Sequence, residues 1–185
     1  IYQFMRRPDG TYCMPFTTEA IKEIFGCPPE SVSEDFSPIA RAVLAEDLDR
    51  LIASIEASAA TLTTCEWEYR VQLPGRPIRW LLGRSTPQKL ADGAIVWNGF
   101  NMDVTERRQT EEAIRRNEAR LEGLLRISQH QARSIQELLD FALDEAIRLT
   151  GSRIGYIYLY DDRKQEFTLN TWSKGVMEAC SIQNP

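Results

Sequence analysis

The residue types that carry most protein chemistry are sparse in this 185-residue chain and do not cluster. Its one histidine is His130, and its four cysteines lack the paired spacing of a zinc site or a disulfide framework: Cys13, Cys27, Cys65 and Cys180. The sequence shows no nucleophile–base pair, metal-ligand cluster or glycine-rich phosphate loop. We therefore expect that the chain itself is not an enzyme, that it binds no metal, and that its cysteines are free cytosolic thiols.

A polar pair at the end of an apolar strand is the most informative feature. Between Trp97 and Arg108, the residues Asp103 and Thr105 separate the strand from a charged helix with no turn between them. Asp and Thr side chains accept hydrogen bonds from the free N–H groups of a helix's first turn, so they fix the angle at which strand becomes helix. We predict that Asp103 ends the strand, that Thr105 is the N-cap, and that this junction transmits rather than catalyses.

Composition indicates an ordinary globular chain, with 43% apolar and 26% charged residues. No run approaches the length of about 18 apolar residues that a membrane span needs, and the start at Ile1 lacks the apolar stretch of a signal peptide. The net charge of −5 gives no electrostatic reason to expect nucleic acid or anionic lipid. We expect a cytoplasmic fragment with neither a membrane span nor a nucleic-acid partner.

Prolines and hydrophobic periodicity divide the chain into elements. Prolines occur up to Pro87 and then not until Pro185, which indicates a change from strands and turns to long helix. The pattern predicts a hairpin over 2–14 that turns at 8–10, a helix over 19–25 capped by Thr18, and a helix over 46–60. Three strands follow, over 65–73, 79–87 and 95–103, before a helix that starts near 106.

The order of hairpin, helices and three strands, together with Gly93, Gly99, the pair Arg79-Trp80 and the Asp-x-Thr motif, resembles a PAS domain. The resemblance covers residues 1–108 and implies an α+β fold, with a five-stranded antiparallel sheet and flanking helices. In this family the Asp-x-Thr motif joins the sensor core to an output helix. We divide the chain into a PAS sensor domain over 1–105, a connecting signalling helix over 106–133 and a third region over 134–185.

Matching the strand ends to the PAS pattern turns one set of side chains toward the cavity between sheet and helices. The candidate ligand-binding residues are Tyr69, Leu81, Gly83, Ser85, Trp97 and Asn101. They would hold a small, mostly neutral organic molecule, with Ser85 or Asn101 as polar anchor. In the alternative reading, these polar groups bond to backbone or water inside a filled core.

The family's known cofactors are not expected. The Asn-Cys-Arg-Phe motif of its flavin-binding branch does not occur between Ser31 and Ala60, so no covalent flavin is expected. The stretch 44–47 reads Leu-Ala-Glu-Asp where many relatives have His-Pro-Glu-Asp, so the axial histidine of haem-binding relatives is missing. We predict no cofactor.

The opposite face of the sheet is also apolar, at Trp80, Leu82, Phe100 and Met102. An antiparallel sheet with two apolar faces needs a second cover, and a dimer partner or a segment before Ile1 would supply it. Steps of seven along the connecting helix, from Ile114 to Leu121 and from Ser128 to Ile135, are typical of a short coiled coil. We expect a homodimer through the sheet and this helix; the alternative is a single helix folded onto its own domain.

Two further residues on the connecting helix, Gly123 and His130, are interpreted individually. Gly123 is unfavourable in a helix by about 1 kcal/mol and is a candidate soft point. His130 lacks the acidic residue and the Arg-Thr-Pro-like turn that follow the phosphorylated histidine in kinase dimerisation helices. We favour a solvated linker histidine over a phosphoacceptor.

The last region resembles the opening of a GAF domain. An amphipathic helix over 135–149 ends at Gly151, a strand over 154–160 follows, and a polar turn leads back into a strand over 167–172 and Trp172-Ser173-Lys174. We expect the N-terminal portion of a truncated GAF domain, with at least about half of that domain lying after Pro185. By resemblance the parent is a sensor histidine kinase. The alternatives are the sensor region of a cyclic-dinucleotide enzyme or transcription activator, and a PAS module that only assembles.

Overall fold

The structure is a computed structural model that describes residues 1–173. The chain divides into two compact units, Ile1–Thr110 and Glu111–Pro185. Within the described residues, no helix combines the length and the apolar character needed to cross a bilayer. Cys180 and Lys174, which entered the sequence analysis, lie outside the described residues.

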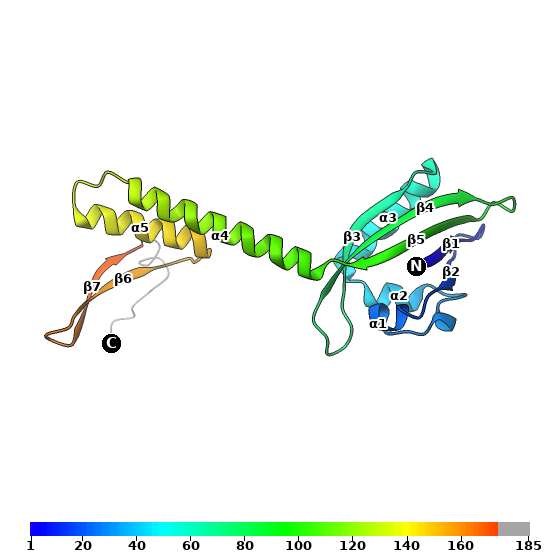
Figure 1. Cartoon of the computed structure of the whole chain (residues 1–185), viewed down its shortest axis with the longest axis horizontal. Coiled ribbons are helices and arrows are strands. Elements are labelled where there is room, and N and C mark those ends of the chain that lie inside the picture. The colour runs from blue at the N-terminus through cyan, green and yellow to red at the C-terminus, as the bar shows by residue number, and fades with distance from the viewer. Residues whose placement is uncertain (174–185) are drawn as a thin grey trace, which may run out of the picture. The chain divides into compact units, whose positions relative to one another are not determined.

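The first unit is built on one antiparallel sheet of five strands (Figure 1). The strands are β1 (Tyr2–Arg6), β2 (Tyr12–Thr17), β3 (Cys65–Val71), β4 (Arg79–Lys89) and β5 (Ile95–Asp103). Their order across the sheet is β2-β1-β5-β4-β3, so the N-terminal hairpin adds beside the last strand. The predicted fold class is confirmed.

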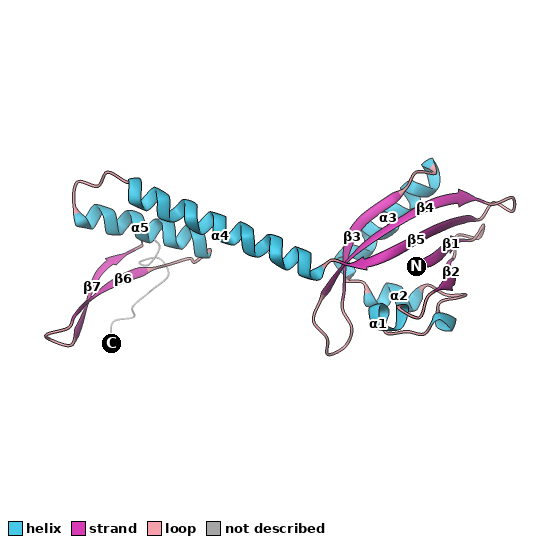
Figure 2. Cartoon of the chain, viewed as in Figure 1, coloured by secondary structure: helices cyan, strands magenta, loops and turns pink. Residues whose placement is uncertain are grey.

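The helices of the first unit are short, apart from one, and pack against this sheet (Figure 2). They are α1 (Ile21–Phe25), the 3-10 turn η1 (Pro29–Ser31), α2 (Ser37–Ala42) and α3 (Ala45–Thr61). Leu51 and Ile55, one turn apart on α3, are buried against Tyr69, Leu81 and Trp97 of the sheet. The core therefore lies between the helices and one face of the sheet.

The N-terminal hairpin forms as predicted, and its turn chemistry is visible. Gly10 has a φ of 85°, and the Asp9 carboxylate accepts a hydrogen bond from the Thr11 N–H at 2.9 Å. The predicted cap at Thr18 is wrong. Helix α1 begins at Ile21 with no side-chain cap, because the carbonyl oxygen of Thr18 accepts the Ile21 N–H in a turn that precedes the helix.

The second unit contains the rest of α4 (Thr105–Gln129), α5 (Ile135–Thr150) and a hairpin of β6 (Tyr156–Asp161) and β7 (Glu166–Trp172). The predicted glycine C-cap is confirmed, since Gly151 has a φ of 66°. Helix α4 ends earlier than predicted, at Gln129, and Ser134 caps α5 by accepting the Glu137 N–H. Ile135 therefore belongs to α5, and the step of seven from Ser128 is interrupted.

Helices α4 and α5 run antiparallel where they meet inside the second unit. A Cβ at Gly123 would lie 2.6 Å from Leu149 Cδ1, Arg126 pairs with Glu145 at 3.0 Å, and further along the ring of His130 stacks on Phe141 at 4.0 Å. Gly123 is buried, and its missing side chain allows the two helices to pack closely, which the sequence did not indicate. His130 is not the solvated histidine expected, since it stacks on Phe141 and its Nε2 is buried.

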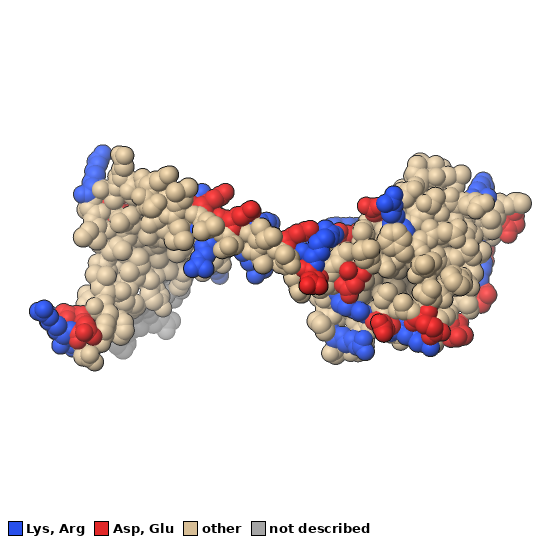
Figure 3. All heavy atoms as spheres, in the orientation of Figure 1, with Lys and Arg blue, Asp and Glu red and all other residues tan. Residues whose placement is uncertain are grey.

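Helix α4 is highly charged, and four of its large apolar side chains are exposed. Figure 3 shows acidic and basic side chains interspersed along it. Glu112 pairs with Arg115 at 2.8 Å and with Arg116 at 3.0 Å. Ile114, Leu121, Leu124 and Leu125 are between 53% and 59% exposed.

Candidate functional site

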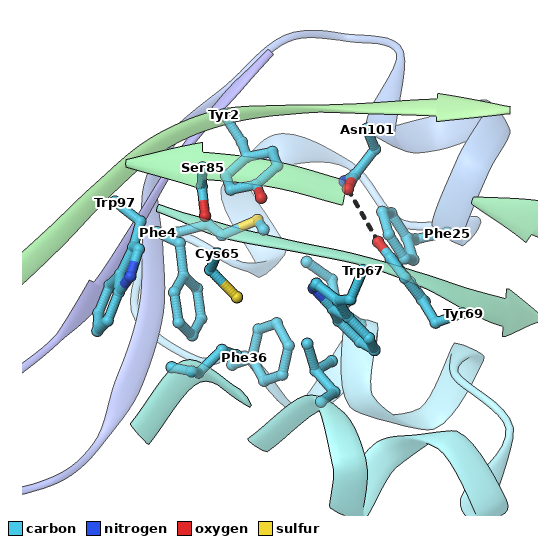
Figure 4. Close-up of a pocket in the computed structure, with 14 residues that line it drawn as sticks. Tyr2, Phe4, Phe25, Phe36, Cys65, Trp67, Tyr69, Ser85, Trp97 and Asn101 are labelled. Carbon is cyan, nitrogen blue, oxygen red and sulfur yellow. Dashed lines mark hydrogen bonds between the residues drawn. The ribbon is translucent and has the colours of Figure 1, made fainter. Parts of the chain in front are cut away.

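A small cavity lies between the sheet and the helices of the first unit, surrounded mainly by aromatic side chains (Figure 4). Four of the six predicted ligand-binding residues line it: Tyr69, Ser85, Trp97 and Asn101. Leu81 is fully buried in the adjoining core. Gly83 lies beside the cavity, where an added Cβ would be 3.1 Å from Asn101 Oδ1 and 3.4 Å from Tyr69 Cε1.

The cavity is small for a ligand site. Its volume is about 40 Å³, whereas sites for small molecules usually measure roughly 300–1,000 Å³. A space of this size holds a few water molecules at most. Side chains from β1, α1 and the residue before α2, namely Phe4, Phe25 and Phe36, occupy the room that an organic ligand would need.

Several polar groups around the cavity have partners within the chain. The Tyr69 hydroxyl donates to Asn101 Oδ1 at 3.0 Å, drawn as the dashed line in Figure 4. Trp97 Nε1 donates to Ser58 Oγ at 2.9 Å, and that hydroxyl donates to the Thr63 carbonyl at 2.6 Å. These bonds favour the alternative of a filled core, with side chains as the partners of Asn101 and Trp97.

Burial keeps the cavity uncharged. It raises the pKa of Tyr69 well above its ordinary value, and the neighbouring Tyr2 adds to the effect. Burial likewise raises the pKa of the Cys65 thiol. Among the described residues, no group of three or more His, Cys, Asp and Glu side chains could hold a metal ion.

The predicted junction is held by a compact set of hydrogen bonds. Asp103 Oδ1 accepts from the Thr105 N–H at 2.9 Å and from the Thr105 hydroxyl at 2.6 Å. The Thr105 hydroxyl accepts from the Trp80 N–H at 2.9 Å, and the Trp80 carbonyl accepts from the Val104 N–H at 2.9 Å. The N-cap role predicted for Thr105 is thus corrected: it is the first residue of α4, and its hydroxyl ties the helix to β4.

Arg79 makes a second set of polar contacts at this junction. Its Nη2 donates to the carbonyl oxygens of Glu23 and Ile24 in α1, the latter at 2.9 Å, and its Nη1 lies 3.8 Å from Asp103 Oδ2. Phe25, next in α1, lines the cavity. Arg79 therefore connects an element at the cavity with the junction.

The outer face of the sheet is less exposed to solvent than the sequence indicates. Arg70 and Arg108 lie over the ring of Trp80, at 5.5 and 4.8 Å from its centroid, so the chain itself covers this ring. Leu82 is half-buried, and Phe100 and Met102 are 37% and 52% exposed. Phe16 of β2 is 55% exposed and was not among the predicted residues.

An ion pair joins the start of α3 to β3. Arg70 Nε and Nη2 donate to the two oxygens of Asp47, each at 2.8 Å, and Asp47 also accepts the Arg70 backbone N–H. Asp47 is buried, and hydrogen bonding from Arg70 lowers the pKa of its carboxyl. A buried carboxylate with these partners stabilises the fold only while it is ionised.

Replacing Ser58 with Ala should destabilise the first unit. The buried Trp97 Nε1–H would lose its acceptor, which costs about 1–3 kcal/mol in the free energy of unfolding. Urea unfolding measures it, with Thr61→Ala as the control, because that hydroxyl bonds only at the exposed end of the same helix. Equal stability of the Ser58→Ala protein and the wild type would mean that Trp97 has another acceptor.

Replacing Asp47 with Asn should cost about 1–3 kcal/mol near neutral pH, because it weakens the charge-assisted hydrogen bonds that Arg70 donates to this buried carboxylate. The loss should shrink with acid. The folded-state pKa of Asp47 is lowered, so its contribution is complete above the unfolded value of about 4 and disappears as pH falls through the folded value. Urea unfolding over a pH series checks this, with Glu46→Gln as an exposed control. A pH-independent difference would contradict it.

Comparison with known proteins agrees with this geometry. Residues 14–101 match the family model described as PAS fold, and residues 132–185 match that of the GAF domain. A methyl sulfide methyltransferase-associated sensor from Methanosarcina acetivorans is 43% identical over 82 residues, which are 44% of this chain and 8% of that protein. The match therefore spans a small part of its relative.

Two solved structures are similar at low identity. A sensory box histidine kinase/response regulator from Burkholderia thailandensis is 23% identical, with a TM-score of 0.48, over 65% of this chain and 89% of that one. A domain of a putative light and redox sensing histidine kinase from Haloarcula marismortui is 18% identical, with a TM-score of 0.48, and the similarity covers 56% of this chain and 89% of that one. The chain thus matches the PAS fold over residues 14–101 and the GAF domain over residues 132–185, and two sensor domains in this order support a role as a signalling sensor.

Proposed function

We propose that the chain is the sensory and dimerisation region of a cytoplasmic signal-transduction protein, which passes a conformational change in the PAS core through residues 103–105 into α4. The observation that supports this most is the junction itself. Strand β5 ends at Asp103 and α4 begins at Thr105, and both are bonded to each other and to β4. A helix held in this way changes direction when the sheet changes shape.

The parent protein, in this proposal, is a sensor histidine kinase. The resemblance to a PAS and GAF tandem supports it, and the relative from Methanosarcina acetivorans is itself named a sensor. The test is to incubate the full-length parent with labelled ATP and look for acid-labile phosphate on histidine. Synthesis of a cyclic dinucleotide, or ATP-independent activation of transcription, would instead assign one of the other two parents.

A second candidate is a PAS module that only assembles, without binding a ligand. The cavity of about 40 Å³ and its internally bonded polar groups favour this candidate over a ligand sensor. A ligand would have to displace side chains such as Phe36. Mass spectrometry of gently purified protein separates the two, because a retained small molecule supports the ligand sensor.

The junction residues should be needed for coupling more than for folding. In the full-length protein, Asp103→Ala with Thr105→Ala removes the bonds to the helix start and to Trp80, at a cost of about 1–2 kcal/mol in stability. This is comparable to the roughly 1–3 kcal/mol of coupling between allosteric sites. Output should therefore lose its response to the input signal while the PAS fold persists. A response of wild-type amplitude in a folded double variant would refute the proposal.

The dimer proposed here uses the exposed apolar side chains of the sheet and of α4. Phe100→Glu should weaken dimerisation by roughly tenfold or more, because it would place a charge in an apolar contact. Leu82→Glu should act in the same direction. Analytical ultracentrifugation measures the dissociation constant, with Gln88→Ala as a control at an exposed site on β4. A wild-type fragment that is monomeric at micromolar concentrations would contradict the proposed dimer.

A further inference from the structure

The ring of Trp80 lies under two guanidinium groups that come from different elements. Arg70 of β3 is the cross-strand neighbour of Trp80, and its Cζ is 5.5 Å from the ring centroid. Arg108 comes from the first turn of α4, and its Cζ is 4.8 Å away. Arginine over the face of an indole is attracted by the ring's quadrupole, so the three side chains form one stack.

Each arginine is fixed at its far side by a carboxylate. Arg70 is held by both oxygens of Asp47, which is the third residue of α3. Arg108 Nε donates to Glu68 Oε2 at 2.5 Å, and Glu68 also pairs with Arg107. A guanidinium group that is held by a carboxylate has few alternative positions. A displacement of Asp47 or Glu68 therefore moves the arginine that it holds and, through that arginine, the Trp80 ring.

The main chain of Trp80 contacts the same helix start. Its N–H and carbonyl bond to Thr105 and Val104, so backbone and ring both meet the first turn of α4. At the other end of the stack, α3 carries Leu51 and Ile55, which line the cavity one and two turns after Asp47. A shift of α3 would move the Asp47 carboxylate and, with it, Arg70.

We propose that Trp80 is a positioning residue that couples the start of α3 to the first turn of α4, as a second route beside the 103–105 junction. This rests on the proposed function and deepens it. It names the path by which a change on the α3 side of the cavity reaches the output helix, and it assigns the Arg70–Trp80–Arg108 stack a role in coupling.

Hydrogen–deuterium exchange of the whole 185-residue chain tests the proposal. Trp80→Leu removes the ring but keeps an apolar side chain and both backbone bonds. Exchange should become roughly fivefold faster in peptides covering the start of α3 and the start of α4, with β5 unchanged. The control is Arg84→Gln, on the same strand and face, whose pairing with Glu66 involves neither helix.

A second variant guards against general destabilisation. Arg108→Lys keeps a charge for Glu68 but removes the planar group over the ring. Exchange at the start of α3 should still rise about twofold, although nothing in α3 has changed and Arg108 has no bond to it. If the Trp80 ring supported only α4, a substitution in α4 would not change exchange at the start of α3.

Faster exchange at α4 alone in the Trp80→Leu protein would overturn the proposal, because the ring would then support only its own neighbour. If the Trp80→Leu substitution raises exchange everywhere, β5 included, the result for the Arg108→Lys protein is decisive. An unchanged exchange rate at the start of α3 in that protein overturns the proposal. The readout needs neither an input signal nor an output domain. Failure here is therefore distinguishable from failure of the proposed function, which shows in the output of the junction variants.

Discussion

A backbone N–H or carbonyl group that is buried on folding needs a hydrogen-bond partner within the protein. At the end of the β4–β5 ladder, the first residue of α4 and the residue before it supply these partners. The last pair of the ladder is Leu81 with Asp103, and beyond it the N–H and carbonyl of Trp80 bond to Thr105 and Val104. An unpaired buried group would cost about 1–3 kcal/mol. The sheet therefore continues its bonding directly into α4, which leaves no room for a flexible loop between sensor core and helix.

The cavity and the junction are parts of one hydrogen-bonded and packed structure. Arg79 connects the end of α1 to Asp103, while Asp47 and Arg70 connect the start of α3 to the outer face of the sheet. Both helices carry residues that line the cavity. Because the cavity is small and several of its polar groups bond within the chain, a conformational signal needs only a change in side-chain packing. The same geometry serves a sensor or an assembling module.

Sequence reasoning succeeded where the information is local. The hairpin followed from turn residues around Gly10, and alternation along β5 placed Trp97 inward and Phe100 outward. It failed where partners are distant in the chain. The bond from Trp97 to Ser58 spans 39 residues, although Ser58, as a polar residue in register with Leu51 and Ile55 on the buried face of α3, was a usable signal. The second partner of Thr105 depends on where β4 lies, which no local pattern specifies.

The end of α4 shows the same division. Residues 130–133 contain neither Gly nor Pro, so the local pattern favours a helix that continues through them. Ser134 with Glu137, however, has the spacing of a capping box and marks the start of α5.

Native-state hydrogen exchange by NMR tests most directly whether β5 and α4 are rigidly joined. The Trp80, Val104 and Thr105 amides should exchange only through global unfolding of the first unit, as slowly as those in the middle of β5. Rapid exchange, typical of a fraying helix end, would contradict the account.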